Sequence, residues 1–379
     1  MAGLCAVAMA AGCAGLLGYE ELRADEPGDG GAEASPDGAA PDAGPTADAG
    51  PCRDLLTNAN HCGRCGHGCL GGECSKGTCQ PFRLKGGIRP TSVVVDGARV
   101  YWLESYGARV GQLEKDGSGA IDLASSSSPG NSAPTGLAVD DANLVWGTVS
   151  GNILRCAIGG CAATPQPVSS SLAFRAAVLD STNVYWLEGF KGDQGTIKRA
   201  PKGATNAPPQ ELVGDAGPAF PAPLYRIAAD LDALYVTSGD GSVLRVTKAD
   251  GGVATVGQGL GQAFAIAIDD ANVYWTGFDD PGAIYKAPKA GGATTSLASG
   301  EHSPIGVAVD RVHIYWATPY VDLGDNSGTI RSCSLAACNT DTRTLAENQA
   351  QPVAIAVDDD AIYWASAGAD GGLMKLAKP

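Results

Sequence analysis

The chain has 379 residues, including 53 Gly and 23 Pro, and its aromatic content is 6%. This composition is typical of many short strands and turns rather than of helices, and it predicts an all-β fold. A formal net charge of −15 argues against nucleic acid and against an anionic membrane surface as partners.

Residues 1–13 have the apolar character of an export signal and are too short to span a membrane stably. The sequence Ala10-Ala11-Gly12-Cys13 resembles a bacterial lipobox, in which the cysteine is acylated after cleavage and becomes the mature N-terminus. That resemblance implies a lipoprotein leader with Cys13 as the lipidation site. A simple secreted protein is the alternative.

Residues 14–51 consist mainly of Ala, Gly, Pro and Asp, with almost no large apolar side chains. Such a segment cannot bury enough surface to offset the entropy of ordering, so we predict a disordered linker. Its acidic residues repel one another and extend it. The linker would hold the folded part away from a membrane anchor.

Residues 52–80 contain six cysteines and too little apolar sequence for a core, which predicts a cross-linked module. After an export signal the even number favours three disulfides. Zinc binding by Cys62-x2-Cys65 with His61 and His67 is the alternative, and we expect no metal. The cysteines are Cys52, Cys62, Cys65, Cys69, Cys74 and Cys79.

The stretch from Asn60 to Cys69 has the core Cys-Gly-x-Cys-Gly-x-x-Cys, followed by Gly72-Glu73-Cys74 and Gly77-Thr78-Cys79. It resembles the cysteine-rich module of the stigma-specific secreted protein family. The resemblance covers less than a tenth of the chain, and it implies a small extracellular module without a particular chemistry.

Residues 81–379 repeat one phrase seven times, in which an Asp lies five residues before a Tyr or its equivalent. The spacing of 39–50 residues is that of a four-stranded propeller blade. All six Trp follow the Tyr position directly. The seven Asp are Asp96, Asp140, Asp180, Asp230, Asp269, Asp310 and Asp358. We assign the Asp to tight turns and the Tyr-Trp pairs to packing between blades.

The sixth repeat illustrates the expected blade. An apolar first strand at 304–309 leads into the Asp310 turn and a second strand at 312–316, and two more strands begin near 328 and 342. The last repeat has only three strand segments, so residues 81–86 should supply its fourth strand and close the ring. We therefore predict a seven-bladed β-propeller.

The Asp turn followed by an aromatic strand resembles the Tyr-Trp-Thr-Asp and NHL groups of β-propellers, most closely at Tyr274-Trp275-Thr276-Gly277. The first group is usually six-bladed, whereas seven repeats are present here. The resemblance covers about 299 residues. It implies the fold and leaves the function open, because propellers perform many functions.

Two short cysteine pairs, Cys156-x4-Cys161 and Cys333-x4-Cys338, occupy the same position in their blades. We expect each pair to close its own hairpin with a disulfide. The repeat region has two histidines, His302 and His313. His313 lies within a strand and is expected to be structural, whereas His302 lies in a loop at one mouth of the channel.

The connections between second and third strands vary most and often pair acids with aromatic residues. Variable loops on a rigid repeat scaffold are typical binding positions. We predict that the binding residues are His302, Glu104, Tyr106, Glu188, Phe190, Asp193, Asp279, Asp280, Tyr320 and Asp322. These side chains suit a basic peptide, a sugar or a divalent cation such as calcium, and the alternative is that they are merely solvated.

The sequence contains no Walker loop, dinucleotide fingerprint, His-Glu-x-x-His motif or EF-hand loop, so we expect no catalytic residue and no cofactor. The leading hypothesis is a monomeric, non-catalytic binding or scaffold propeller of the cell envelope, attached to a membrane only through its lipid. Its partner would be an envelope protein, a peptide or a glycan. The alternatives are a lyase or hydrolase with a site at the channel mouth, or a purely structural component.

Overall fold

The structure is a computed structural model that describes residues 54–128, 130–131, 134–189, 195–213, 220, 222–320 and 327–379. The predicted leader with Cys13, the linker and Cys52 lie outside the described residues, as do Phe190, Asp193 and Asp322.

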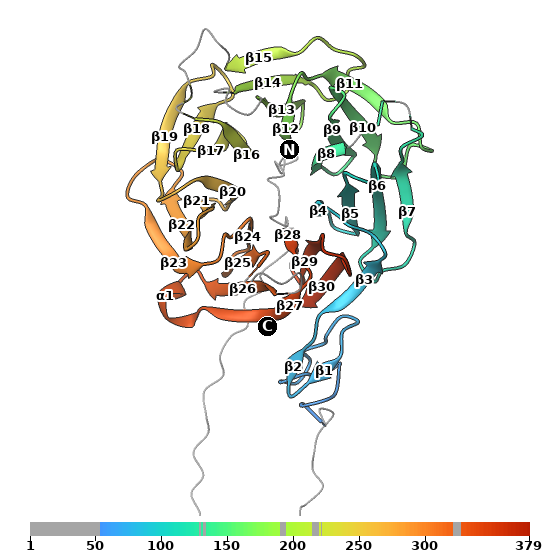
Figure 1. Cartoon of the computed structure of the whole chain (residues 1–379), viewed down its shortest axis with the longest axis vertical. Helices are drawn as coiled ribbons and strands as arrows, with labels where there is room; N and C mark the ends of the chain where they lie inside the picture. Colours follow the sequence, from blue (N-terminus) through green and yellow to red (C-terminus); the bar gives the residue numbers. More distant parts are fainter. Residues whose placement is uncertain are drawn as a thin grey trace, which may run out of the picture.

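Seven four-stranded antiparallel sheets are arranged in a ring, which confirms the predicted seven-bladed propeller (Figure 1). Blades 1 and 2 are β4 (Ser92–Val95), β5 (Arg99–Glu104), β6 (Arg109–Glu114) and β7 (Ile121–Ala124), then β8 (Pro134–Val139), β9 (Asn143–Thr148), β10 (Asn152–Ala157) and β11 (Gln166–Ser170). Blades 3 and 4 are β12 (Phe174–Leu179), β13 (Asn183–Glu188), β14 (Thr196–Pro201) and β15 (Gln210–Val213), then β16 (Leu224–Ala229), β17 (Ala233–Ser238), β18 (Ser242–Thr247) and β19 (Val253–Gln258). Blades 5 and 6 are β20 (Ala263–Ile268), β21 (Asn272–Gly277), β22 (Gly282–Pro288) and β23 (Thr295–Glu301), then β24 (Gly306–Val309), β25 (His313–Thr318), β26 (Gly328–Ser334) and β27 (Arg343–Gln349).

Blade 7 closes the ring in the predicted way. Its first three strands are β28 (Pro352–Val357), β29 (Ala361–Ser366) and β30 (Gly372–Ala377), and its fourth is β3 (Phe82–Gly86) from the start of the repeat region. The strands β3 and β30 run antiparallel, with Phe82 opposite Lys375. Closure removes the open sheet edge that both chain ends would otherwise leave.

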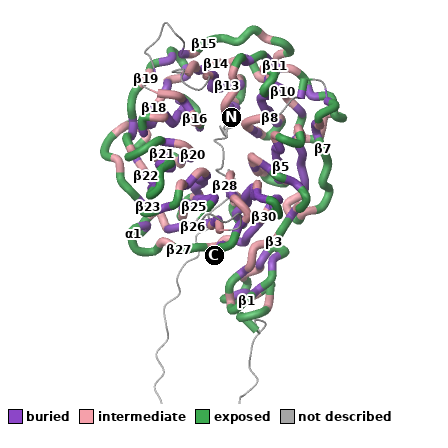
Figure 2. The backbone as a smooth tube through the Cα atoms, viewed as in Figure 1, coloured by how far each residue is buried: buried purple, intermediate pink, exposed green. Residues whose placement is uncertain are grey.

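The core lies between neighbouring blades, where apolar side chains of adjacent sheets meet. Each of the six Trp side chains is fully buried, and burial of a large aromatic side chain contributes about 2–3 kcal/mol. Figure 2 shows this pattern as buried residues along the inner strands and exposed residues on the outer strands and loops. The described residues contain one helix, the four-residue α1 (Cys338–Asp341), so no helix among them is long enough to cross a membrane.

The repeated Asp organises the turn between the first and second strand of every blade. In blade 3, Asp180 Oδ1 accepts hydrogen bonds from the backbone N–H groups of Thr182 and Asn183, both at 2.8 Å. In five blades the other carboxylate oxygen accepts the Tyr hydroxyl five residues later, as in Tyr235 to Asp230 at 2.9 Å. The predicted structural role of this Asp is therefore confirmed.

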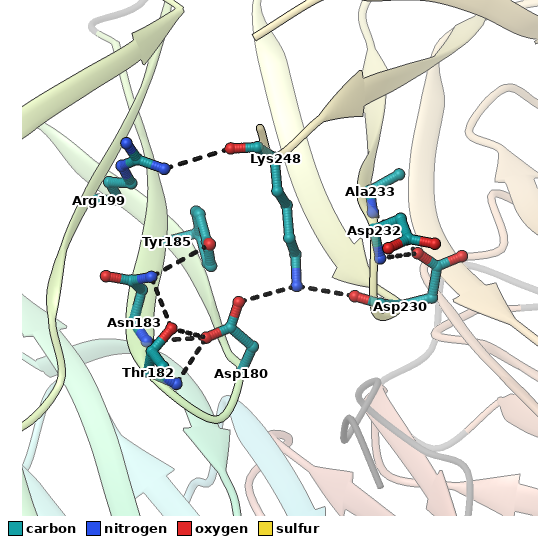
Figure 3. A network of polar contacts seen from close by, with 9 residues as sticks. All are labelled: Asp180, Thr182, Asn183, Tyr185, Arg199, Asp230, Asp232, Ala233 and Lys248. Carbon is teal, nitrogen blue, oxygen red and sulfur yellow. Dashed lines mark hydrogen bonds and ion pairs between the residues drawn. The ribbon is translucent and has the colours of Figure 1, made fainter. Parts of the chain in front are cut away.

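A lysine joins each of five turns to the next blade. Lys248 follows the third strand of blade 4, and its Nζ lies 3.0 Å from Asp180 Oδ2 in blade 3 and 2.7 Å from the backbone oxygen of Asp230 (Figure 3). The same side chain lies over the Tyr185 ring, 5.0 Å from its centroid. The equivalent pairs are Lys115–Asp358, Lys202–Asp140, Lys289–Asp230 and Lys378–Asp310. We call these contacts the lysine bridges.

The two blades without a lysine bridge to their predecessor are the two with disulfide hairpins. Ile158 and Leu335 occupy the lysine position, and the described residues include no cationic partner for the turn carboxylates Asp96 and Asp269. Both apolar residues pack against buried side chains. They lie inside the loops closed by Cys156–Cys161 and Cys333–Cys338. A covalent clip and apolar packing therefore replace the ion pair at these junctions.

The cysteine-rich module is held by disulfides and rests against the end of blade 7. Its short strands β1 (Cys74–Ser75) and β2 (Thr78–Cys79) pair antiparallel. Disulfides join Cys62 to Cys74 and Cys69 to Cys79, and Cys65 is also disulfide-bonded. Cys62 and Cys65 are thus not free to bind zinc, which excludes that alternative.

His67 links this module to the propeller. Its two ring nitrogens each lie 2.8 Å from a carbonyl oxygen, Nδ1 from that of Cys62 and Nε2 from that of Lys378. Lys378 also forms the lysine bridge to Asp310. The module therefore contacts the same junction that ties blade 7 to blade 6.

The lysine bridges should make stability depend on acid pH. Burial raises the pKa of Asp180, but hydrogen bonds from Asn183 and Thr182 and the Lys248 ammonium outweigh it and lower the pKa from 3.8 to about 2. A lowered folded-state pKa stabilises the protein fully above the unfolded pKa, and the stabilisation is lost as pH falls through the folded value. The shift corresponds to about 2 kcal/mol.

We predict that Lys248→Met lowers the free energy of unfolding by about 2 kcal/mol at pH 7. The difference from the native protein should begin to shrink as pH falls below about 4 and should be roughly halved near pH 2, because protonation of Asp180 removes the charge that Lys248 pairs with. Urea unfolding across this pH range measures the effect. Lys286→Met, at a half-buried lysine with no ion pair among the described residues, is the control. An equal, pH-independent loss in both variants would contradict the prediction.

Candidate functional site

The two ends of the propeller differ in what they carry. One end holds the Asp turns and the lysine bridges, and we call it the turn face. The opposite end holds the connections from second to third strands and those between blades, and we call it the loop face. The predicted binding residues that the structure describes belong to the loop face by their position in the blades.

Two of the predicted binding acids are buried structural groups. Glu104 is the last residue of β5 and accepts hydrogen bonds from the Arg89 backbone N–H at 3.0 Å and from Arg109 Nε at 2.8 Å. Glu188 ends β13 and lies 2.7 Å from Lys198 Nζ, while Trp186 Nε1 donates to it at 2.9 Å. Burial raises the pKa of Glu188, but these contacts outweigh it and lower the pKa. Both carboxylates therefore have partners within the fold, so the alternative of merely solvated loop acids does not apply to them, and their predicted role in binding stays a prediction.

The remaining described residues of the predicted set are exposed on the loop face. Tyr106 is 96% exposed and Tyr320 44%, and Phe278, which was not in the predicted set, is 37% exposed. Phe278 belongs to the loop of Asp279 and Asp280, both of which are exposed. His302 Nδ1 lies 3.1 Å from Asp280 Oδ1, in an exposed pair. The structure thus brings His302 together with one predicted acid.

The loop face carries a set of exposed apolar side chains, of which the sequence analysis singled out only Tyr106 and Tyr320. The described part of the propeller has nine exposed large apolar side chains. Six are on the loop face, two, Leu231 and Val312, are on the turn face, and Ile121 begins an outer strand. The six are Tyr106, Val149, Leu172, Leu260, Phe278 and Tyr320.

The loop face leads into the central channel through a cavity of about 410 Å³, lined by the first strands of the blades. Arg175 from β12 and Arg226 from β16 are among its lining residues. At this edge Tyr225, Phe264 and Phe278 form a row, with ring centroids 5.5 Å and 5.3 Å apart. Aromatic rings and guanidinium groups therefore meet where the channel opens.

A larger cavity of about 1090 Å³ lies at the turn face, between the Asp turns and the module loop at residues 64–70. Four of its carboxylates, those of Asp230, Asp269, Asp310 and Asp358, are turn Asp of the repeat. His313 lines this cavity too, with its ring centroid 6.0 Å from that of Tyr315. Because four of its eight lining Asp and the lysines Lys289 and Lys378 already serve the fold, we take the loop face as the better candidate site.

No protein-family model and no curated protein sequence matches the chain. The resemblances to the Tyr-Trp-Thr-Asp, NHL and stigma-specific groups therefore stay predictions. Solved structures with a similar fold include the computationally designed Ika8 protein, with TM-score 0.51 and 15% identity over 78% of this chain and 98% of that one. They also include U3-55K, with TM-score 0.57 and 12% identity over 79% of this chain and 98% of that one. The WD40 β-propeller domain of Doa1 matches with TM-score 0.57 and 13% identity over 79% of this chain and 95% of that one. At such low sequence identities, the structural similarity shows the fold alone.

The two kinds of loop acid should respond differently to substitution. We predict that Glu188→Gln lowers the free energy of unfolding by about 1–3 kcal/mol, because it leaves the half-buried ammonium of Lys198 without its counter-charge. The change at exposed Asp279→Asn should stay within about 0.5 kcal/mol. Thermal and urea unfolding of both variants measure this, and equal stability of the two would refute the structural role of Glu188.

Proposed function

We propose that this protein is an exported, non-catalytic binding module whose loop face holds an envelope protein, a peptide or a glycan. The observation that carries the proposal is the position of the exposed apolar side chains. Single exposed apolar residues are ordinary on protein surfaces. Here six of the nine in the described propeller stand on one face, around a channel mouth.

The scaffold beneath this face suits recognition. The loops extend from sheets whose turns are fixed by carboxylates and whose blades are joined by the lysine bridges. A rigid base lowers the entropy lost when a partner binds. Exposed tyrosine and phenylalanine supply large contact areas with few rotatable bonds, as in many recognition surfaces.

The disulfides point to an extracellular or periplasmic protein. Two hairpins and the small module are cross-linked, and such bonds form and persist in oxidising compartments. Anchoring through Cys13 is our proposal for how the protein is retained at a membrane, with residues 14–51 as a linker.

The rival function is an enzyme acting at the channel mouth, and the observation that favours it is the His302–Asp280 pair. A carboxylate that orients an imidazole is one part of a general-base arrangement. A role for His302 in catalysis would make His302→Ala abolish turnover while partner binding persists, in a screen of lyase and hydrolase substrates.

We predict that replacing Tyr106, Phe278 and Tyr320 together with Ser abolishes capture of the partner from envelope extract. The mature chain with intact disulfides is the bait, and captured material is identified by mass spectrometry and glycan analysis. A triple variant of Ile121, Leu231 and Val312 to Ser removes similar apolar surface elsewhere and should keep the partner. Retention of the same partner by both variants would show that the loop face is not the binding surface.

We predict that Cys13→Ser moves the protein from the membrane fraction to the soluble fraction of the envelope. The acylated thiol is lost, and a hydrophobic anchor contributes about 0.8 kcal/mol for each buried CH₂ group. Fractionation in the native host and metabolic labelling with a fatty acid measure the change. Cys5→Ser is the control and should leave both readouts unaltered. Membrane association and labelling that survive Cys13→Ser would contradict the anchor.

A further inference from the structure

The repeat itself identifies a residue that the fold does not require. Four residues before the turn Asp, six blades carry a small side chain and blade 4 carries Arg226. The small residues are Ser92, Gly136, Ala176, Ala265, Gly306 and Ala354. Because six blades form the same sheet without an arginine there, packing alone does not explain the guanidinium.

The neighbouring position provides a second arginine. Five residues before the turn Asp, blade 3 carries Arg175, and the other blades carry uncharged residues. These are Thr91, Thr135, Tyr225, Phe264, Ile305 and Val353. The strands β12 and β16 that hold the two arginines are adjacent in the ring, so both charges fall on one side of the channel.

Both arginines line the cavity of about 410 Å³, and no Asp or Glu is among its described lining residues. Within the part of the chain that the structure describes, neither guanidinium forms an ion pair. Arg175 Nε donates to the Gly189 carbonyl at 2.7 Å, and Arg226 Nη1 donates to the Tyr225 carbonyl at 3.0 Å. An arginine has five N–H donors, so most of the donors of each group have no protein acceptor among the residues that the structure describes.

Aromatic rings hold the two groups in place. The Arg226 guanidinium carbon lies 4.6 Å from the Phe264 ring centroid, and that of Arg175 lies 5.9 Å from the Tyr225 centroid. Stacking of this kind fixes the orientation of the planar guanidinium group before a ligand binds. The Arg226 side chain remains accessible from the channel. The surrounding channel walls desolvate it in part, and together with the charge of Arg175 they lower its pKa to about 10, so it remains charged at neutral pH.

We propose that the channel mouth binds a small organic oxyanion, a carboxylate or a phosphate monoester, between Arg175 and Arg226. Arginine pairs carboxylate and phosphate groups through two parallel hydrogen bonds. The apolar side chains of the inner strands, such as Ile227 and Ile305, would surround the body of the ligand. A volume of this size suits a small molecule. The lining of this cavity does not include Tyr106, Phe278 or Tyr320, the exposed residues on which the proposed binding of a macromolecule depends. The anion site and the macromolecular binding surface can therefore be tested independently.

The test uses the full mature protein and three probes of similar size: benzoate, phenyl phosphate and neutral benzamide, at constant ionic strength. We expect benzoate or phenyl phosphate to raise Tm with concentration and to give a measurable Kd by calorimetry. Benzamide should do neither. The two anions show whether a carboxylate or a phosphate is preferred.

The variants copy residues that other blades already carry, which favours normal folding. Arg226→Ala and Arg175→Thr should each weaken anion binding about tenfold or more. Arg311→Ala, which removes an exposed arginine of the turn face, should bind like the native protein. Without ligand, Arg226→Ala should have a Tm equal to or above the native value, because a like charge beside Arg175 is gone. Unchanged affinity in both channel variants, or no binding of either anion to the native protein, would overturn the proposal.

Discussion

The carboxylate of the repeated Asp is the group on which the rest of the propeller depends. In blade 3, one oxygen of Asp180 accepts two backbone N–H groups and fixes the turn, and the other accepts the Lys248 ammonium of the next blade. The same side chain therefore determines local geometry and the register between sheets. Because sequence repetition places this group at every turn, tertiary order follows from one local motif.

The substitution of this contact at two junctions shows how the ring tolerates variation. Where Ile158 and Leu335 replace the lysine, no charge reaches the turn carboxylate among the described residues, and a disulfide closes the same hairpin. A short disulfide loop restricts the unfolded chain only modestly. Its more direct effect is to hold an apolar residue against the buried side chains of the adjoining blades.

The fold was predictable from sequence because the signal repeats. Seven spaced Asp, six Trp and a missing last strand together predicted the blade number and the closure by β3. The binding acids were less predictable, since Glu104 and Glu188 still belong to strands β5 and β13, each two residues beyond the aromatic pair. Their partners, Arg109 and Lys198, lie across the hairpin. The lysine bridges were missed for a similar reason, although a Lys directly after the third strand recurs in five blades.

Function in such a protein is best sought where the repeat is broken. The pattern explains each small residue before the turn Asp, and it leaves Arg226 and Arg175 unexplained. Keeping two guanidinium groups in one channel costs free energy through desolvation and mutual repulsion, and no described carboxylate there offsets it. An anionic ligand would supply the missing charge. The exposed apolar side chains of the loop face are a second feature of this kind. The loop face therefore combines an arginine pair and an apolar surface, neither of which the propeller needs for its own stability.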